Sequence, residues 1–216
     1  MVYKQRILEH KYWVFKNGVS PYICDEILRY VEEKKTLKKG QVGGEEKDIK
    51  TDDPTYKKQL SEVRNSNIIW MHEQWVHNEV FPFVETANKN AGWNFNISGF
   101  ETVQFSKYNV GQFYDWHPDQ YNKPYDGEKN WKKGLIRKIS VSVILNDNFE
   151  GGDFQIREQR DTIDNPEQKD TIKVTVPERG KGTVIVFPSF LWHRVTPVTK
   201  GVRNSLVMWT IGKPFV

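Results

Sequence analysis

The sequence predicts a mainly β protein with helices near its N-terminus. Two segments before residue 92 have apolar residues at helical spacing, whereas from residue 93 onward short β-type segments follow one another without an intervening helix. Gly, Pro, Asn and Asp separate these short segments, which is typical of an antiparallel sandwich or barrel. Aromatic residues make up 13% of the chain, so a packed core is expected and disorder is not.

Length and composition exclude several classes of protein. The 216 residues fit one domain of ordinary to generous size. Lys and Arg number 32 and Asp and Glu 28, and the two signs are mixed along the chain, which argues against a nucleic-acid partner. No apolar run approaches the ~20 residues of a spanning helix, and the N-terminal residues lack the pattern of a secretory signal. Because Cys24 is the only cysteine, we expect a cytoplasmic protein without disulfides or cysteine-bound zinc. Without a long apolar run, no membrane partner is expected either.

The N-terminal part of the chain is predicted to alternate strand, helix, strand and helix. Ser20 can cap the first helix, and Pro21 suits its first position because no intrahelical partner exists there for an amide hydrogen. Residues 37–58 are charged and contain glycines, which predicts a surface loop. The four elements are a strand within 3–15, a helix from 20 to about 36, a strand at 63–70 and a helix at about 72–91.

The remaining residues are predicted to form the β part of the fold. Two polar insertions, 118–134 and 157–170, interrupt it and are long enough to cover the mouth of a barrel. The predicted strands are 93–98, 100–108, 112–117, 136–145, 153–156, 171–176, 183–187, 191–195 and 203–211.

A candidate metal site begins at the end of one predicted strand. His117 and Asp119 are two residues apart, so their side chains point to the same side of an extended chain. His193 lies in a later predicted strand. Two imidazoles and one carboxylate form the facial triad of non-haem Fe(II) oxygenases, which leaves positions open for a bidentate cosubstrate and dioxygen.

A candidate carboxylate site follows in the next predicted strand. Arg203 comes ten residues after His193, and its guanidinium can pair bidentately with a carboxylate. Ser205, two residues further and on the same side of the strand, can add a hydrogen bond. The pattern therefore combines a metal end with a carboxylate end.

Longer motifs around these residues resemble one enzyme family. Residues 108–119 read YxxGxxYxxHxD, and residues 137–146 read RKISVSVILN and are followed by EGGDF. Residues 187–205 read FPSxxWHRVTPVTxGVRxS. These motifs resemble the prolyl 4-hydroxylase branch of the 2-oxoglutarate/Fe(II) dioxygenases, and in particular the bacterial PKHD-type hydroxylases. The resemblance covers about 98–212, whereas residues 1–97 match only in the order of their elements.

The resemblance implies a fold and a set of cofactors. The fold would be a double-stranded β-helix, a jelly-roll or cupin-like open barrel with helices packed on one sheet. A single domain would span 1–216, with 1–97 as a supporting region and 98–216 as the barrel core. The cofactors would be Fe(II), 2-oxoglutarate and O2, with ascorbate as the reductant.

The resemblance also implies roles for individual residues. His117, Asp119 and His193 would be the catalytic metal ligands. Arg203 would bind the distal carboxylate of 2-oxoglutarate, and Ser205 and Tyr108 would assist it. Some prolyl hydroxylases have Tyr where this chain has Ile144, and many have Lys where it has Arg203, so the cosubstrate contacts are expected to differ in detail.

Two further residues bear on the substrate. By resemblance, Arg137 and Trp209 would line the pocket beside the iron and hold a prolyl residue of a peptide or protein. An indole face suits a pyrrolidine ring, and a guanidinium suits a peptide carbonyl. The alternative is that Trp209 belongs to the core and Arg137 is a surface charge. The nucleic-acid demethylases of the superfamily typically have a second Arg at the position of Trp209. This chain lacks that Arg, which argues against nucleic-acid repair.

Three other functions stay open at this point. The chain could hydroxylate a free amino acid or another small molecule, demethylate nucleic acid, or be a binding module without catalysis. Among the neighbours of the candidate ligands, Trp116 and Trp192 are predicted to point to the opposite strand face, into the core. Tyr114 faces either the metal or the supporting strand.

Overall fold

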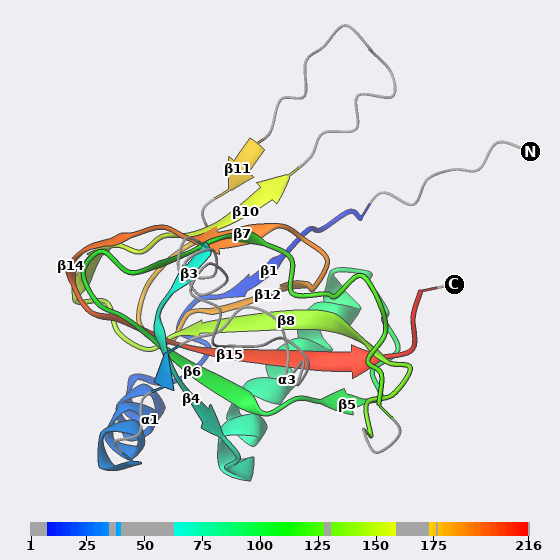
Figure 1. The fold of residues 1–216 in the computed structure, drawn as a ribbon, viewed down its shortest axis with the longest axis horizontal. Coiled ribbons are helices and arrows are strands. Elements are labelled where there is room, and N and C mark those ends of the chain that lie inside the picture. Colours follow the sequence, from blue (N-terminus) through cyan, green and yellow to red (C-terminus); the bar gives the residue numbers. More distant parts are fainter. Residues whose placement is uncertain are drawn as a thin grey trace, which may run out of the picture.

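The computed structural model describes residues 8–34, 38–39, 63–127, 131–158, 173–175 and 177–215. Two antiparallel sheets face each other across a cavity, and helices lie against the outer side of the larger sheet (Figure 1). The helices are α1 (Pro21–Lys34) and α3 (Gln74–Asn90). This architecture confirms the predicted mainly β fold with helices packed on one sheet.

The larger sheet has eight strands, which come from both ends of the chain. Its longest strand, β15, pairs with β8 on one side and with β6 and β5 on the other. The order across the sheet is β1 (Trp13–Phe15), β12 (Val184–Pro188), β8 (Ile136–Ile144), β15 (Arg203–Gly212), β6 (Val103–Tyr108), β4 (Asn67–Met71) and β2 (Lys38–Lys39), with β5 (Gly99–Phe100) beside β15.

The smaller sheet has five strands and lies over the cavity side of the larger one. Its order is β11 (Lys173–Thr175), β10 (Phe154–Glu158), β13 (His193–Val195), β7 (Phe113–His117) and β3 (Arg64–Asn65). A separate ribbon joins β9 (Phe149–Gly151) to β14 (Val198–Gly201).

Two apolar layers hold the sheets and helices together. The first lies between the helices and the larger sheet and includes Ile27, Val84 and Val141. The second lies between the two sheets and includes Ile156 and Phe187. Because β12 is covered on both faces, its sequence VIVFP is an apolar run without alternation. In β8, IRKISVSVI, apolar residues in the layer against the helices alternate with serines on the other face.

The first helix begins where its sequence predicts. The backbone N–H of Ile23 donates to the Ser20 hydroxyl at 3.3 Å, and Pro21 occupies the first helical position. This contact satisfies one of the amide donors that a helix leaves without an internal partner. The second predicted helix is also confirmed, as α3.

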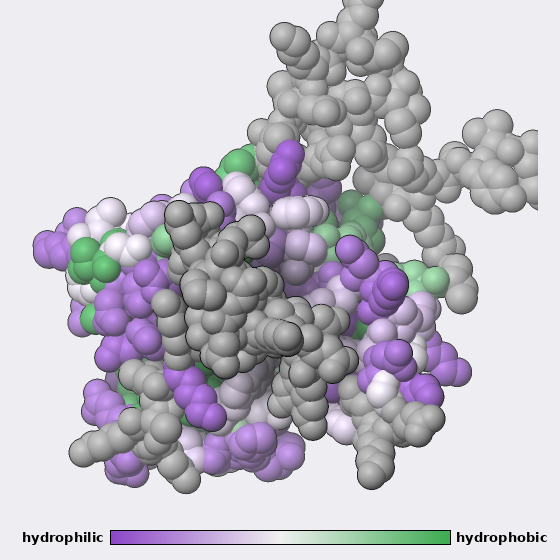
Figure 2. Space-filling view, in the orientation of Figure 1, coloured by the Kyte–Doolittle hydropathy of each residue, from purple (hydrophilic) through white to green (hydrophobic). Residues whose placement is uncertain are grey.

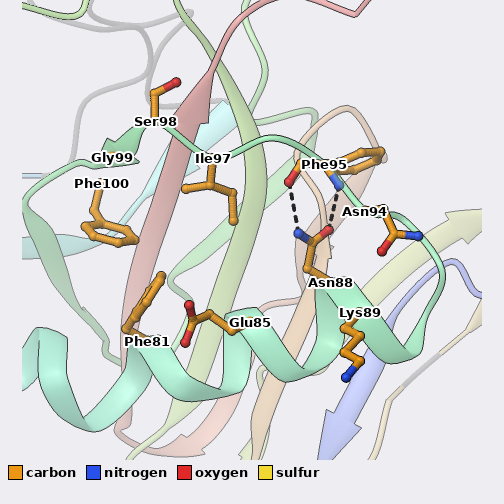
Figure 3. Close-up of a pocket in the computed structure, with 10 residues that line it drawn as sticks. All are labelled: Phe81, Glu85, Asn88, Lys89, Asn94, Phe95, Ile97, Ser98, Gly99 and Phe100. Atoms are coloured by element: carbon orange, nitrogen blue, oxygen red, sulfur yellow. Dashed lines mark hydrogen bonds between the residues drawn. The ribbon is translucent and has the colours of Figure 1, made fainter.

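Residues 93–98 form no strand, and here the prediction is wrong. Their backbone runs beside α3, where the Asn88 side chain takes the place of a strand partner (Figure 3). Its amide nitrogen donates to the Phe95 carbonyl, and its oxygen accepts from the Phe95 N–H, each at 2.9 Å. The side chain therefore satisfies both backbone groups that a β ladder would otherwise pair.

Other differences concern the ends of elements and one side chain. The sequence did not indicate the short strands β9 and β14, and Trp192 is 48% exposed although we expected a core residue. In the predicted strand at 3–15, the part before residue 8 lies outside the described residues. The predicted loops at 37–58 and 157–170 also lie outside them, except for short stretches at β2 and β10.

The surface of the described residues is strongly polar. Most of the coloured residues on the face in Figure 2 are hydrophilic, in agreement with 28% charged residues in the sequence. Neither α1 nor α3, the helices of the described part, has the length and apolarity needed to cross a bilayer.

Gly182 gives a test of how the N-terminal region is joined to the larger sheet. Its φ is +80°, its carbonyl accepts from Val19 N–H at 3.0 Å, and an added Cβ would collide with the Val19 carbonyl oxygen. We expect Gly182→Ala to lower the free energy of unfolding by at least about 2 kcal/mol, measured by chemical denaturation. Gly180→Ala is the control, because a Cβ there finds ordinary space, and it should change stability by less than about 0.5 kcal/mol. Equal effects of the two substitutions would contradict this account.

Candidate active site

One cavity of about 440 Å³ lies between the two sheets. Strands of both sheets contribute to its walls, so residues far apart in the sequence meet there. All eight site residues predicted from the sequence line it: Tyr108, His117, Asp119, Arg137, His193, Arg203, Ser205 and Trp209.

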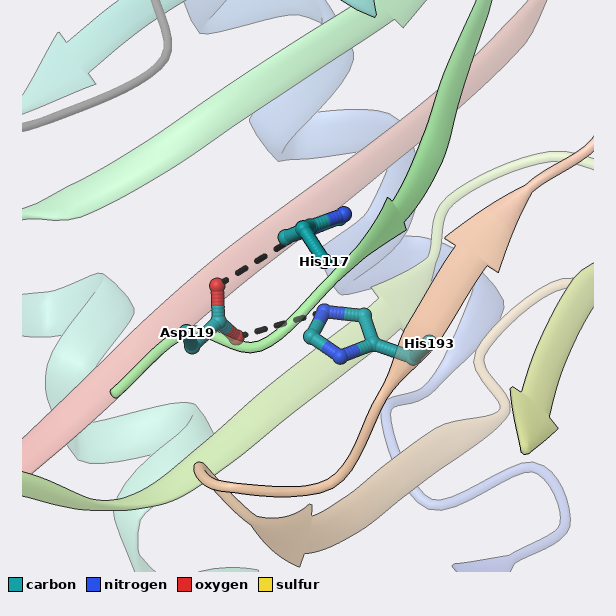
Figure 4. A group of neighbouring side chains, drawn as sticks. All are labelled: His117, Asp119 and His193. Atoms are coloured by element: carbon teal, nitrogen blue, oxygen red, sulfur yellow. Dashed lines mark ion pairs between the residues drawn. The ribbon is translucent and has the colours of Figure 1, made fainter. Parts of the chain in front are cut away.

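The two histidines and the aspartate converge at one end of the smaller sheet (Figure 4). His117 ends β7 and is paired with His193, the first residue of β13. Their donor atoms and those of Asp119 all lie within 4.8 Å of one another. The Nε2 atoms of His117 and His193 are 3.8 and 3.4 Å from the Asp119 carboxylate oxygens.

Backbone carbonyls fix the orientation of both imidazole rings. His117 Nδ1 lies 2.6 Å from the Asp115 carbonyl, and His193 Nδ1 lies 2.9 Å from the Leu191 carbonyl. Because a carbonyl only accepts, each Nδ1 carries the hydrogen and each Nε2 keeps its lone pair. Second partners of this kind are typical of histidines that bind a metal.

Burial and local charge set the protonation states of His117 and Asp119. Burial, followed by the neighbouring His193, lowers the pKa of His117 to about 3. Burial alone would raise the pKa of Asp119, but His193 and His117 hold it below its usual range. A neutral imidazole and an ionised carboxylate are the forms that bind a metal ion.

The donor set fits Fe(II). Two imidazole nitrogens and one carboxylate leave open positions on a metal ion, as the facial triad of non-haem iron requires. Asp119 Oδ2 is buried and has no hydrogen-bond partner among the described residues. A cation between the three side chains would satisfy this oxygen.

Arg203 lines the same cavity as the triad. It is 1% exposed, and its Nη1 donates to the Ser205 hydroxyl at 2.8 Å. Its Nε and Nη2 have no hydrogen-bond partner within the described part of the chain, and burial lowers its pKa. A buried guanidinium with two unused nitrogens fits a bidentate carboxylate ligand such as the distal end of 2-oxoglutarate.

Neighbouring residues shape the space around Arg203. Tyr108 is its pairing partner on β6, and the guanidinium carbon lies 5.5 Å from the Tyr108 ring centroid. Gly152 has φ +60°, and a Cβ there would come within 3.0 Å of the Arg203 side chain. A glycine at this turn therefore lets the arginine pass into the cavity.

Arg137 and Trp209 lie together on the wall of the cavity. The guanidinium carbon of Arg137 is 4.0 Å from the centroid of the Trp209 ring, which is cation–π contact. Trp209 is 5% exposed, and its indole N–H has no hydrogen-bond partner among the described residues. Arg137 is therefore not a surface charge, and Trp209 is buried and also borders the cavity.

Three cavity residues were not recognised as site residues from the sequence alone. Tyr114 stacks on the His117 ring at 3.4 Å between centroids, and Arg64 lies 4.5 Å from the centroid of the Tyr114 ring. Trp70, from β4, lies 6.1 Å from Trp209. Tyr114 precedes His117 by three residues on β7, and the sequence left its orientation open. No local spacing links Arg64 or Trp70 to the triad, because strand pairing alone brings β3 and β4 beside the site.

The comparison with known families matches the part of the chain that holds the site. The family model described as the 2OG-Fe(II) oxygenase superfamily matches residues 103–211, which include all eight predicted site residues. A PKHD-type hydroxylase of Aliarcobacter butzleri is 37% identical over 107 residues. That alignment covers 49% of this chain and 41% of the relative, so the match spans about two fifths of the relative's length.

Solved structures share the fold over nearly the whole chain. A viral collagen prolyl hydroxylase from Paramecium Bursaria Chlorella virus-1 gives a TM-score of 0.60 at 18% identity, over 94% of this chain and 97% of that one. A Trichoplax adhaerens prolyl hydroxylase, solved with a peptide fragment of hypoxia inducible factor, gives 0.59 at 16% identity, over 94% and 84%. The expected double-stranded β-helix is thereby confirmed. Since the family model matches half of the sequence and includes both the triad and Arg203, the chain belongs to the 2OG-Fe(II) oxygenase superfamily.

Proposed function

We propose that this chain is an Fe(II)- and 2-oxoglutarate-dependent dioxygenase that hydroxylates an unactivated C–H bond. One observation carries the proposal: the His–Asp–His triad and the buried, partly unpaired Arg203 line the same cavity. A metal site and a carboxylate-binding arginine in one cavity suit 2-oxoglutarate, which can bind the metal through its keto acid group and the arginine through its distal carboxylate. We further propose that residues 1–216 act as one catalytic domain.

His117, Asp119 and His193 would hold the iron through two Nε2 atoms and a carboxylate. When bound, Fe(II) with 2-oxoglutarate supplies a reaction in which one oxygen atom of O2 enters the substrate and the other enters succinate, with release of CO2. Arg203, oriented by Ser205 and flanked by Tyr108, would bind the distal carboxylate and so fix the direction of the keto acid. Arg203, Ser205 and Tyr108 are all buried, so bulk water is kept away from the proposed carboxylate site.

The substrate is proposed to be a prolyl residue in a peptide or protein. Arg137 and the unpartnered indole N–H of Trp209 offer donors to a substrate carbonyl, and the Trp209 ring offers a face to a pyrrolidine. The likeness to prolyl hydroxylases, one of them solved with a peptide, supports this choice over a free amino acid. Ascorbate is proposed as the reductant.

The metal centre is tested by anaerobic titration with Fe(II) and 2-oxoglutarate. We expect a weak visible charge-transfer band in the wild type and none in His193→Ala, because that variant loses one of the three metal ligands. His72→Ala is the control, since His72 is exposed and does not line the cavity, and it should keep the band. A folded wild-type protein without the band would refute the oxygenase proposal.

The carboxylate site is tested with Arg203→Lys. Lysine keeps the charge but loses the planar fork, so the dissociation constant of 2-oxoglutarate should rise about tenfold to a hundredfold. The constant is read from the same band, and Arg29→Lys, on the exposed face of α1, should leave it unchanged. An unchanged constant in Arg203→Lys would mean that the keto acid binds elsewhere.

The substrate wall is tested with Trp209→Phe. Phenylalanine keeps a ring but removes the indole N–H, so the KM for a proline-rich peptide should rise about tenfold with the Fe(II) and 2-oxoglutarate band intact. The assay is peptide-dependent release of succinate together with the mass gain of one oxygen. Trp192→Phe, outside the cavity, is the matched control. Succinate release stimulated by free amino acids and not by peptides would favour the small-molecule alternative.

A further inference from the structure

A buried carboxylate stands behind the proposed substrate wall. Glu101 lies in the connection between β5 and β6 and is 6% exposed. Its Oε2 accepts from Arg137 Nε at 2.5 Å. Its Oε1 accepts from the Tyr125 hydroxyl at 2.7 Å and from Lys132 Nζ at 2.6 Å. Three donors from two parts of the chain therefore share one side chain.

Glu101 is ionised in this setting. Burial alone would raise its pKa, but Arg137, Lys132 and Tyr125 together hold it below its usual range. The same contact acts on Arg137, where burial opposes the charged form and Glu101 raises the pKa. Each charge is thus stabilised by the other inside the protein, and removal of one leaves the other unpaired and buried.

The backbone of Glu101 is fixed as well. Its N–H donates to the Trp209 carbonyl at 2.9 Å. Glu101 therefore contacts both residues of the proposed wall, Trp209 through the main chain and Arg137 through the side chain. The guanidinium then lies between the Trp209 ring at 4.0 Å and the Tyr121 ring at 5.2 Å.

The loop that follows His117 is joined to the Glu101 carboxylate. Its described parts, 118–127 and 131–135, carry Tyr125 and Lys132, and two backbone hydrogen bonds connect them. Tyr125 N–H donates to the Leu135 carbonyl at 2.9 Å, and Gly134 N–H donates to the Tyr125 carbonyl at 2.8 Å. The loop also places Tyr121 in the cavity wall.

We propose that Glu101 is a positioning residue for substrate binding, which acts through Arg137 and fixes the described parts of the 118–135 loop to the barrel. The inference rests on the proposed function, because Arg137 is taken to hold the substrate. Nε of Arg137 is used by Glu101, whereas Nη1 has only a long contact of 3.4 Å with the Asp119 carbonyl. A peptide carbonyl can take that donor.

The test is Glu101→Gln, which keeps the shape of the side chain and removes its charge. We expect the band of bound Fe(II) and 2-oxoglutarate to persist, because Glu101 is not part of the triad or of the Arg203 site. We expect the side-chain Nε–H signal of Arg137 in NMR spectra to shift and to exchange faster with water. Amide hydrogen exchange at Tyr125 and Gly134 should rise about tenfold, since both amides lie in the loop that loses its charged anchor.

Glu150→Gln is the matched control. Glu150 is also paired with a lysine, Lys200, at 2.9 Å, but its side chain is 65% exposed, so none of these signals should change. If Glu101→Gln does not fold, Tyr125→Phe removes one of the three donors without leaving a buried charge and should raise exchange at Gly134. Unchanged Arg137 and loop signals in the folded Glu101→Gln variant would overturn the proposal. Loss of the charge-transfer band in that variant would also overturn it, because the effect would then reach the metal and cosubstrate site.

A double substitution separates positioning from general stability. With a proline-rich peptide as the probe, Glu101→Gln should raise KM about tenfold. In an Arg137→Gln background it should add little, because the two residues act as one unit. Additive effects would contradict action through Arg137. A wild type that has the band but no peptide response would refute the prolyl substrate alone, and the NMR and exchange results would still decide the role of Glu101.

Discussion

The antiparallel pairing of β7 with β13 is the constraint on which the site depends. It sets His193 opposite His117, and the two-residue spacing along the chain then brings Asp119 to the same point. Strand side chains alternate between faces, so a shift of one residue in this pairing would turn one imidazole to the outside. The register becomes irregular directly after His193, between it and Val195. A step of two residues along β13 there corresponds to three along β7, from Tyr114 to His117, so the irregularity lies directly beside the paired histidines.

The polar cavity depends on the apolar core on the other side of the larger sheet. Along β15 the residues Arg203, Ser205, Val207 and Trp209 line the cavity, while Leu206 and Met208 pack toward the helices. Burial of a guanidinium and a carboxylate without full pairing opposes folding. The apolar layer against α1 and α3 supplies the compensating stability, so the N-terminal region supports the site without contributing a predicted ligand to it.

The sequence was informative where chemistry follows from local spacing. His117 with Asp119, and Arg203 with Ser205, are pairs at the strand period, and their shared face could be predicted without a structure. Residues 93–98 were misjudged because the Asn88 side chain replaces a strand partner, and nothing in the spacing indicates that contact. Glu101 was missed for a similar reason. Its partners follow it by 24, 31 and 36 residues, and only the folded loop brings them together.

The position of β15 relates Arg203, Trp209 and the triad to one another within the cavity. Arg203 and Trp209 face the same side of one strand and are six residues apart, or roughly 20 Å along an extended chain. The triad comes from the opposite sheet and faces this strand across the cavity. A keto acid held at Arg203 and a substrate held at Trp209 would therefore approach the metal from different directions. A single strand, paired on both sides, would thus set the distance between the proposed cosubstrate site and the proposed substrate site.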